Sequence, residues 1–268
     1  MTLAAHVLTA HATAIAQRVV AEEEAKRTHL VVALTGAHAF GFASPDSDLD
    51  LKAIHVAPTR HFLGLHGVTP TFDRMEVLEG VEIDYTSNEL GMALAALLRG
   101  NGNFLERVLG PHTLLDGDAL PGLVDLARRA VSQRIHRHYH GFATGQLREF
   151  EKPEGGTAKK ALYVLRTTLT GAHGLRTGEI DPDLTHHLAA NGFDDTEELL
   201  AVKRSGERAP LPAEMRARWQ VRLKDAFAVL DAALKASPLP PEPSREVERD
   251  AEEWLVATRM AGVQMPMV

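Results

Sequence analysis

Apolar and polar residues alternate over short segments in the first third of the chain and follow helical spacing in most of the rest. Near the N-terminus, Leu3 to Lys26 is rich in alanine and valine and predicts an amphipathic helix packed on a sheet. The run His29 to Thr35 predicts a buried strand, and Asp48 to Ala57 alternates, which predicts a strand with one polar face. Met75 to Tyr85 predicts a further strand or hairpin, and Thr59 to Arg74, which lacks a clear period, predicts a loop with about one turn of helix.

Helical spacing dominates after the third predicted strand. Thr86 and Glu89 have the spacing of a capping box, so a helix is expected to begin just after Thr86. The later expected helices are Ala119 to Phe150, Thr157 to Thr177, Thr196 to Glu207, Ala213 to Ala236 and Arg245 to Met260. Prolines in Ser237 to Pro243 predict a stiff linker before the last of them. This order predicts an α/β (α+β) protein, with a small mixed β-sheet core in residues 1–115 and a helical domain in residues 116–268.

Composition narrows the chemistry. The absence of cysteine excludes disulfides, thiolate zinc sites and cysteine nucleophiles. No apolar run reaches the roughly 20 residues that span a bilayer, and no basic segment precedes an apolar core at the N-terminus, so we expect a cytoplasmic protein without a membrane partner. The net charge of −7 argues against broad coating of nucleic acid.

One segment departs from that acidic balance. Residues 131–166 contain seven Lys or Arg residues and three Glu residues, so an anionic partner such as RNA could bind there. Arg134, Arg137 and Arg148 could form a stripe along an RNA backbone, or they could simply keep a long helix soluble.

The strongest candidate site lies around Asp48 and Asp50. Residues two apart in a strand point to the same face about 6.5 Å apart along the chain, so both carboxylates could hold one cation. Asp84, on the polar side of the next predicted strand, is a candidate third carboxylate. Gly36 and Gly41 bracket a tight connection in which backbone N–H groups could meet a phosphate. The alternative is a solvated turn or a surface pair of aspartates.

These motifs together resemble a known superfamily. A Gly-x-x-x-x-Gly loop at residues 36–41, Pro-x-Ser-Asp-x-Asp at residues 45–50 and the strand-borne Asp84 resemble the DNA polymerase β-type nucleotidyltransferases. More narrowly, the chain resembles their bacterial and phage branch of predicted nucleotidyltransferases, some of which are associated with RNA ligases. The segments Leu98 to Glu106 and Lys159 to Arg166 resemble later motifs of that branch, and the resemblance covers about residues 30–178.

The resemblance implies a two-metal reaction. Asp48, Asp50 and Asp84 would be the catalytic residues and would hold two Mg²⁺ ions, with Mn²⁺ as an alternative. A nucleoside monophosphate would pass from an NTP such as ATP to a hydroxyl of an RNA end, a small molecule or a protein, and pyrophosphate would be released. The residues expected to contact the nucleotide are Gly36, Ala37, Gly41, Ser47, Lys52, Lys159, Tyr163 and Arg166.

The glycine loop departs from the family pattern at Ala37, where the superfamily has serine. Losing one hydrogen bond to a phosphate costs about 0.5–3 kcal/mol, which is one or two powers of ten in binding. Ser44, Ser47 or His38 could supply a replacement donor. If none does, the alternative is a noncatalytic nucleotide- or RNA-binding protein that keeps the fold. A phosphohydrolase is a third hypothesis.

The weaker candidates each have a structural alternative. Lys159, Tyr163 and Arg166 share one helical face and could bind a triphosphate or a base, or could form an ordinary solvated face. Lys52 could neutralise phosphate or pair with a carboxylate. Asn101 and Asn103 would either cap the next helix or line an acceptor cleft with Glu106. His136, His138 and His140 alternate along the chain, which on a helix spreads them around the axis and disfavours a shared zinc ion.

Overall fold

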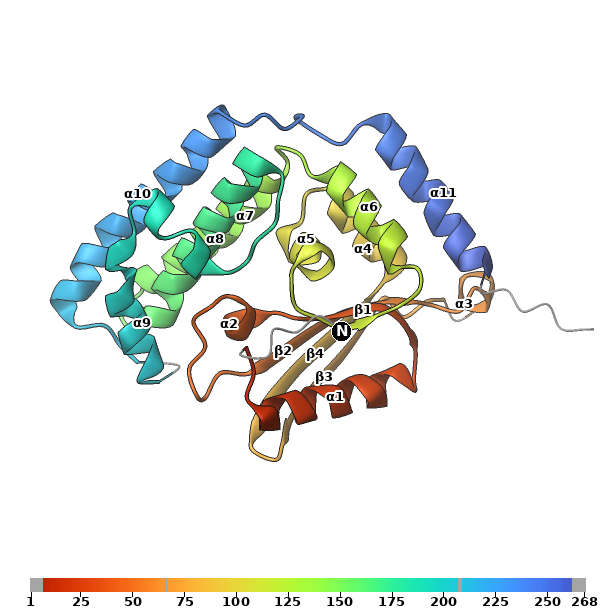
Figure 1. Cartoon of the computed structure of the whole chain (residues 1–268), viewed down its shortest axis with the longest axis horizontal. Helices are drawn as coiled ribbons and strands as arrows, with labels where there is room; N and C mark the ends of the chain where they lie inside the picture. The colour runs from red at the N-terminus through yellow and green to blue at the C-terminus, as the bar shows by residue number, and fades with distance from the viewer. Residues whose placement is uncertain (1–6, 66, 207–208, 262–268) are drawn as a thin grey trace, which may run out of the picture.

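A mixed β-sheet forms the centre of the protein. The computed structural model describes residues 7–65, 67–206 and 209–261, and within them five strands pair in the order β3–β4–β2–β1–β5. The strands are β1 (Thr28–Leu34), β2 (Leu49–Val56), β3 (Thr71–Leu78), β4 (Val81–Glu89) and β5 (Thr113–Asp116). β2 and β4 are parallel, whereas the other neighbours are antiparallel. The α/β fold class expected from the sequence is confirmed (Figure 1).

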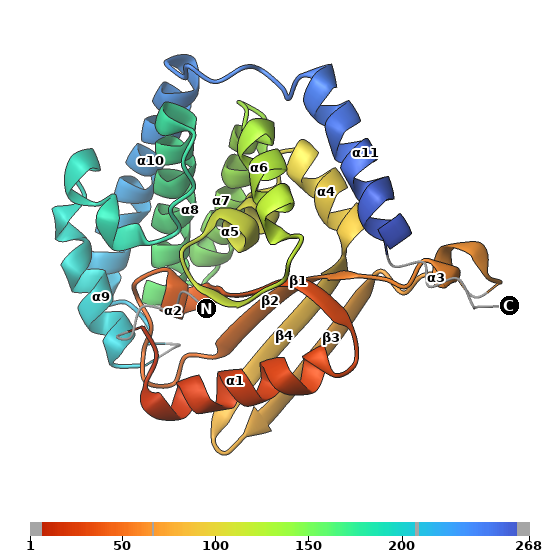
Figure 2. The ribbon, with the colours of Figure 1, turned by 45° about the vertical axis from the view of Figure 1, so that its right-hand side comes forward.

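Helices cover the two faces of the sheet unequally. Figure 2 shows α1 (Ala10–Glu24) on one side of the strands and a second helical layer on the other. That second layer consists of α4 (Leu90–Leu98), α5 (Gly102–Leu109), α6 (Leu120–Ala130) and α11 (Arg245–Ala261). Alternation along β1 separates the two sides, because Val32 belongs to the apolar core under α1 and Val31 to the core under the second layer.

A second group of helices has its own apolar core. Its members are α7 (Ile135–Glu151), α8 (Ala158–Thr177), α9 (Glu197–Arg204) and α10 (Ala213–Lys235). Phe40 and Phe42, which follow the short helix α2 (Gly36–Ala39), are buried in this core beside Trp219 and Leu165. The loop after β1 is therefore anchored between the sheet and the helical group. The division at residues 115 and 116 stays a prediction.

The first third of the chain follows the sequence pattern with corrected boundaries. The first helix begins at Ala10, because Thr9 caps it by accepting a hydrogen bond from the Ala12 N–H; residues 3–6 of the predicted helix lie outside the described residues. The hairpin alternative for Met75 to Tyr85 is confirmed, but β3 begins within the predicted loop. Its two-residue turn has positive φ at Glu79 (50°) and Gly80 (85°), as a type I′ turn requires. The predicted helical turn is α3 (Arg60–Leu63).

The predicted helix start at Thr86 is wrong. β4 continues to Glu89 because its parallel pairing with β2 extends to the pair His55 and Glu89. Glu89 is the N-cap instead, since its carboxylate accepts a 2.6 Å hydrogen bond from the Gly91 N–H. Arg259 on α11 also donates to this carboxylate.

The predicted single helix from Ala119 to Phe150 is also wrong, because the chain turns at residues 131–134 between α6 and α7. There Gln133 uses its backbone N–H to bind Pro240 O and its side chain to bind Leu239 O. The proline-rich linker thus supplies the contacts at this break. The predicted helices over α8, α9, α10 and α11 are confirmed within a few residues, with residue 207 outside the described part. Helix α5 begins after Asn101, where one of the two alternatives for this residue expected a helix cap, whereas β5 was not predicted.

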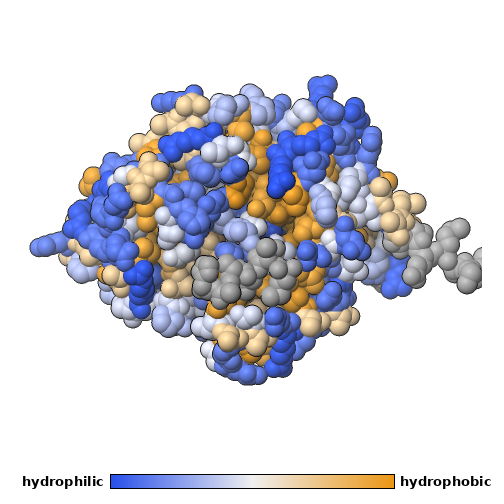
Figure 3. All heavy atoms as spheres, viewed as in Figure 1, coloured by the Kyte–Doolittle hydropathy of each residue, from blue (hydrophilic) through white to orange (hydrophobic). Residues whose placement is uncertain are grey.

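Among the described residues, no helix is long and apolar enough to cross a bilayer. Figure 3 shows mainly hydrophilic atoms over the outer helices and apolar atoms gathered in the seam between the α5–α6 side and the α8–α10 side. Both sides meet in one core, where Leu105 of α5 and Leu230 of α10 belong to the same apolar cluster. The remaining short elements are 3₁₀ turns at Leu184–His186, Ala189–Asn191 and Asp194–Thr196.

Candidate active site

Parallel pairing of β2 and β4 brings Asp50 and Asp84 together. The two residues are direct partners in the ladder, and Lys52 is paired with Thr86 two positions further on. The Lys52 ammonium lies 2.8 Å from Asp84 Oδ1 and 3.9 Å from Asp50 Oδ1. Asp48 lies one residue before β2 and is partly exposed. Lys52 therefore forms the carboxylate salt bridge that was one of its two predicted roles.

The environment of Asp50 disfavours its charge. Burial raises the pKa of Asp50 to about 6 from its ordinary value of 3.8; Lys52 opposes this shift, and the charges of Asp84 and Asp48 add to it. Like charges crowded in a partly buried position are a common feature of functional sites.

The glycine loop packs directly on Asp50. Gly36 has φ of +69°, and a Cβ there would lie 1.8 Å from Asp50 Oδ2, so only glycine fits. The Thr35 N–H also donates a 2.9 Å hydrogen bond to Asp50 O. Glycine is also required at position 41, but for a contact outside the Asp50 site: φ is +79°, and a Cβ there would lie 2.3 Å from Asp183 Oδ1.

A hollow of about 210 Å³ lies over these residues, between the sheet and helices α5, α7 and α8. Its lining residues are Thr35, Gly36, Phe40, Asp50, Lys52, Asn103, Glu106, Arg107, Phe142, Tyr163 and Arg166. Five of the predicted site residues line it, whereas Asp48, Asp84, Ala37, Gly41, Ser47 and Lys159 are outside its lining.

The α8 residues are organised by packing. Arg166 is only 3% exposed, donates a 2.6 Å hydrogen bond to Glu106 Oε1 and stacks 3.8 Å from the centre of the Phe40 ring. Tyr163 packs edge-on against Phe40, and the Lys159 ammonium lies 5.9 Å from the centre of the Tyr163 ring. The solvated-face alternative is therefore wrong for Arg166.

The hydroxyls expected to replace the missing serine bind another residue. Ser44 Oγ and Ser47 Oγ are 3.0 Å apart, and the fully buried Lys203 of α9 donates to both, at 2.5 and 3.2 Å. Ala37 is buried in the apolar core with Phe40. Lys203 thus holds the turn that precedes Asp48, and no signal in the sequence connected residues so far apart.

Helix α5 supplies polar groups that sequence patterns only partly indicated. Asn101 caps this helix by accepting a 3.0 Å hydrogen bond from the Asn103 N–H, so its capping role is confirmed. Asn103 and Glu106 line the hollow and Asn101 does not, so a role of these residues toward an acceptor stays a prediction. Arg107 and Phe142, which also line it, were not predicted.

Partners from outside residues 131–166 reduce the positive charge of that segment. Arg134 pairs with Glu242 and Arg166 with Glu106, both outside the segment, whereas Lys152 and Lys160 pair with Glu149 inside it. Arg137 and Arg148 are exposed. The local count of charges therefore overestimated the basic surface.

The same part of the chain does not form a histidine metal site. His136 Nε2 lies 2.9 Å from Asp231 Oδ1. Across residues 7–65, 67–206 and 209–261, no three His, Cys, Asp or Glu residues are arranged to hold a metal ion as they stand. Nevertheless, the hard oxygen donors of Asp48, Asp50 and Asp84 are of the type that Mg²⁺ prefers, so the donor chemistry fits this ion.

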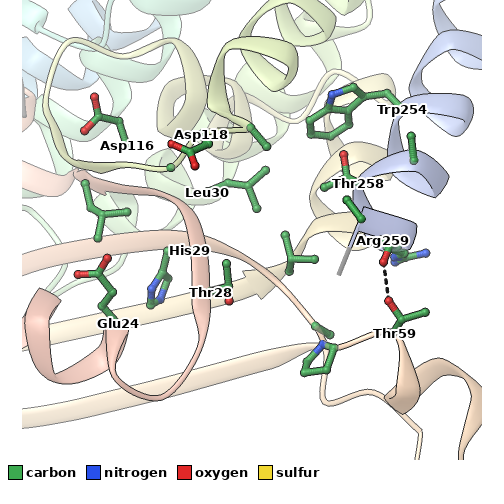
Figure 4. A pocket seen from close by; sticks show the side chains of 18 residues that line it. Glu24, Thr28, His29, Leu30, Thr59, Asp116, Asp118, Trp254, Thr258 and Arg259 are labelled. Carbon is green, nitrogen blue, oxygen red and sulfur yellow. Dashed lines mark hydrogen bonds between the residues drawn. The ribbon is translucent and has the colours of Figure 1, made fainter. Parts of the chain in front are cut away.

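A larger hollow of about 970 Å³ lies at the opposite end of β1 and β2 (Figure 4). Glu24, Asp116 and Asp118 line it together with Trp254 of α11, and Thr59 donates a hydrogen bond to Arg259 O at its edge. Gly117, the glycine that lines this hollow, has no positive φ and packs against the backbone of His29 and Leu30, not against a carboxylate. Chemistry therefore favours the smaller hollow over the larger one.

A mixed sheet that places carboxylates beside a glycine loop is the arrangement of a nucleotidyltransferase-like protein of the polymerase β superfamily. Residues 11–257 match the family described as RlaP, the RNA repair pathway DNA polymerase beta family, and the chain belongs to this family.

Two further comparisons were found. The chain is 24% identical over 226 residues to the uncharacterized protein MJ0002 of Methanocaldococcus jannaschii, covering 84% of this chain and 92% of the relative. The crystal structure of a nucleotidyltransferase-like protein from Exiguobacterium sibiricum 255-15 is 12% identical, with a TM-score of 0.33, covering 95% of this chain and 81% of the other.

Proposed function

We propose that this protein is a Mg²⁺-dependent nucleotidyltransferase that transfers a nucleoside monophosphate from an NTP to a hydroxyl acceptor. The observation that carries the proposal is the register pairing of Asp50 with Asp84, next to Asp48 and against the Gly36 loop. An RNA end is the first acceptor to test, because the family is described as belonging to an RNA repair pathway.

The reaction is an in-line displacement at the α-phosphorus. The acceptor oxygen forms a bond to this phosphorus as the bond to the bridging oxygen of the β-phosphate breaks, so pyrophosphate leaves with the electron pair and the hydroxyl proton passes to water. Mg²⁺ bound by Asp48, Asp50 and Asp84 would supply charge stabilisation for the attacking and leaving oxygens.

The protein's own groups orient the two substrates. Backbone N–H groups after Gly36 would bind the triphosphate. The Lys52 ammonium, which pairs with Asp84 in this structure, would pair with a phosphate oxygen instead. Tyr163, held by Phe40, would offer a ring face to the base. Asp84, on the strand away from the glycine loop, would face the acceptor.

The test incubates the protein with each α-labelled NTP, Mg²⁺ and a pool of total RNA, and measures pyrophosphate release and label transfer. Asp48→Ala and Asp50→Asn are each expected to lower the rate more than about a hundredfold, since they remove metal-binding oxygens. Asp118→Asn, in the larger hollow, is the matched control and should keep the wild-type rate. Equal loss in Asp118→Asn, or none in Asp50→Asn, would contradict the proposal.

A noncatalytic nucleotide or RNA binder is the second candidate, favoured by the buried Ala37 and by the engagement of Ser44 and Ser47 with Lys203. NTP binding without pyrophosphate release would support it. Release of free phosphate or monophosphate without a labelled acceptor would instead indicate a phosphohydrolase.

A further inference from the structure

Arg107 is a buried cation on the wall of the candidate active site. Its side chain lines the hollow, and the residue is only 6% exposed. Nη1 donates to Ala53 O at 2.8 Å and to Asn88 Oδ1 at 2.7 Å, and both acceptors are neutral. The Nε–H has no acceptor among the described residues, and burial lowers the pKa of the guanidinium to about 10.

The other arginine of the hollow has a different environment. Arg166 pairs with the buried carboxylate of Glu106, whereas no carboxylate in the described part of the chain pairs with Arg107. A buried charge without a counter-charge is costly unless something compensates it. A guanidinium with donors left over in a substrate pocket is suited to a phosphate oxygen.

The position of Arg107 indicates which substrate would bring that phosphate. Asn88 belongs to β4 and lies on the same face as Asp84, four residues along the strand, or about 13 Å. The glycine loop follows β1, which is separated from β4 by β2. Arg107 is bound to β2 through Ala53 O and to β4 through Asn88, one or two strands away from β1, so the guanidinium lies toward the side of the hollow that the proposed reaction leaves for the acceptor.

We propose that Arg107 binds a phosphate of the acceptor, namely the last phosphodiester of a single-stranded RNA end. This inference rests on the proposed function for the assignment of the two sides. It excludes an acceptor without phosphate, such as a neutral small molecule or a protein hydroxyl. Asn88 acts as a positioning residue that aims the guanidinium.

The experiment measures binding, so it does not depend on turnover. A ten-nucleotide oligoadenylate with a 5′-fluorescein label is titrated with the full chain in Mg²⁺, without NTP, at several salt concentrations. Arg107→Gln is expected to weaken binding about tenfold or more and to lower the slope of log K against log salt by about 0.7, the value for one phosphate contact of a single strand. Arg107→Lys should keep the slope. Arg249→Gln, exposed on α11, is the charge-matched control and should resemble wild type.

A modified RNA tests the same contact with wild-type protein, so the test does not depend on whether the Arg107 variants fold. Replacing the last 3′ phosphodiester by an uncharged methylphosphonate should weaken binding to wild-type protein by the same factor. If Arg107→Gln folds, it should show no additional loss with this RNA, because both changes remove one contact.

Wild-type binding that ignores the methylphosphonate would overturn the inference, as would an Arg107→Gln variant that binds RNA normally. A loss of ATP binding in Arg107→Gln, measured by equilibrium dialysis, with RNA binding intact would assign the residue to the nucleotide and also overturn it. If RNA binds through Arg107 but pyrophosphate is never released, the inference stands and the proposed function fails. If nucleotidyl transfer occurs but neither Arg107→Gln nor the methylphosphonate weakens RNA binding, the proposed function stands and the inference about Arg107 fails.

Discussion

The two faces of the sheet handle charge in opposite ways. Under α1, the carboxylate of Glu23 is 3% exposed and is bound by Lys26, Arg27 and Arg74 from three directions. On the other face, Asp48, Asp50 and Asp84 crowd like charges around Lys52, and the pKa of Asp50 rises. Both faces are built from alternating residues of the same strands. The difference separates scaffold from site, because three cations surround one carboxylate under α1, whereas three carboxylates share one lysine on the other face and leave negative charge that a bound cation could neutralise.

Glu23→Gln is expected to show the largest effect on stability. Although burial raises the pKa of Glu23, hydrogen bonds from Lys26 and Arg27 outweigh it and lower the pKa overall. Removing the charge leaves the largely buried Arg27 without its carboxylate and takes one of three carboxylates from Arg74, at a cost of about 3–5 kcal/mol. Denaturant unfolding measures this, and a loss below about 1 kcal/mol would contradict the pairing.

Asp50→Asn makes the matched change on the other face and should have the opposite sign. Because the folded-state pKa of about 6 lies above the unfolded value, the folded protein binds more protons between pH 4 and 6, so charging Asp50 lowers stability as pH rises. At pH 8 the variant should be more stable by up to about 3 kcal/mol while losing transfer activity. The gain should vanish at pH 4, which unfolding curves at both pH values would test; destabilisation at pH 8 would refute it.

Acid should weaken the α1 face next. Burial lowers the pKa of His29 and His55 to about 4 from 6.5, so the unfolded chain binds more protons between these values. Stability is fully present above pH 6.5 and falls as pH decreases, by about 2 kcal/mol for each histidine at pH 5. His138, near the hollow, should respond similarly. His29→Gln should flatten the curve of unfolding free energy against pH. An unchanged curve would show that His29 does not contribute to the acid-induced loss of stability.

Ala37→Ser should have the smallest effect. It restores the family's serine, but the Cβ of Ala37 lies in an apolar core with Phe40. NTP affinity is therefore expected to change less than about tenfold, and stability to fall by about 1 kcal/mol because a hydroxyl is buried. Equilibrium dialysis with labelled NTP measures the affinity. A gain of a hundredfold would show that the hydroxyl reaches the phosphate.

Local patterns were sufficient for part of the candidate site. The alternation that places Asp50 and Lys52 on one face, the glycine after β1 and the cap at Asn101 all depend on residues a few positions apart. Strand period, positive φ and capping are local properties, so these predictions needed no knowledge of the fold.

Tertiary structure decided the rest. The sequence did not show that β2 and β4 pair in parallel, which extends β4 to Glu89 and sets Asp84 beside Asp50. Lys203 reaches Ser44 from 159 residues away, and Arg107 reaches Ala53 from 54 residues away. Such contacts arise when apolar faces of distant elements pack and force the nearby polar groups to find partners. Spacing along the chain determines which face a residue occupies, whereas only packing determines what meets it there.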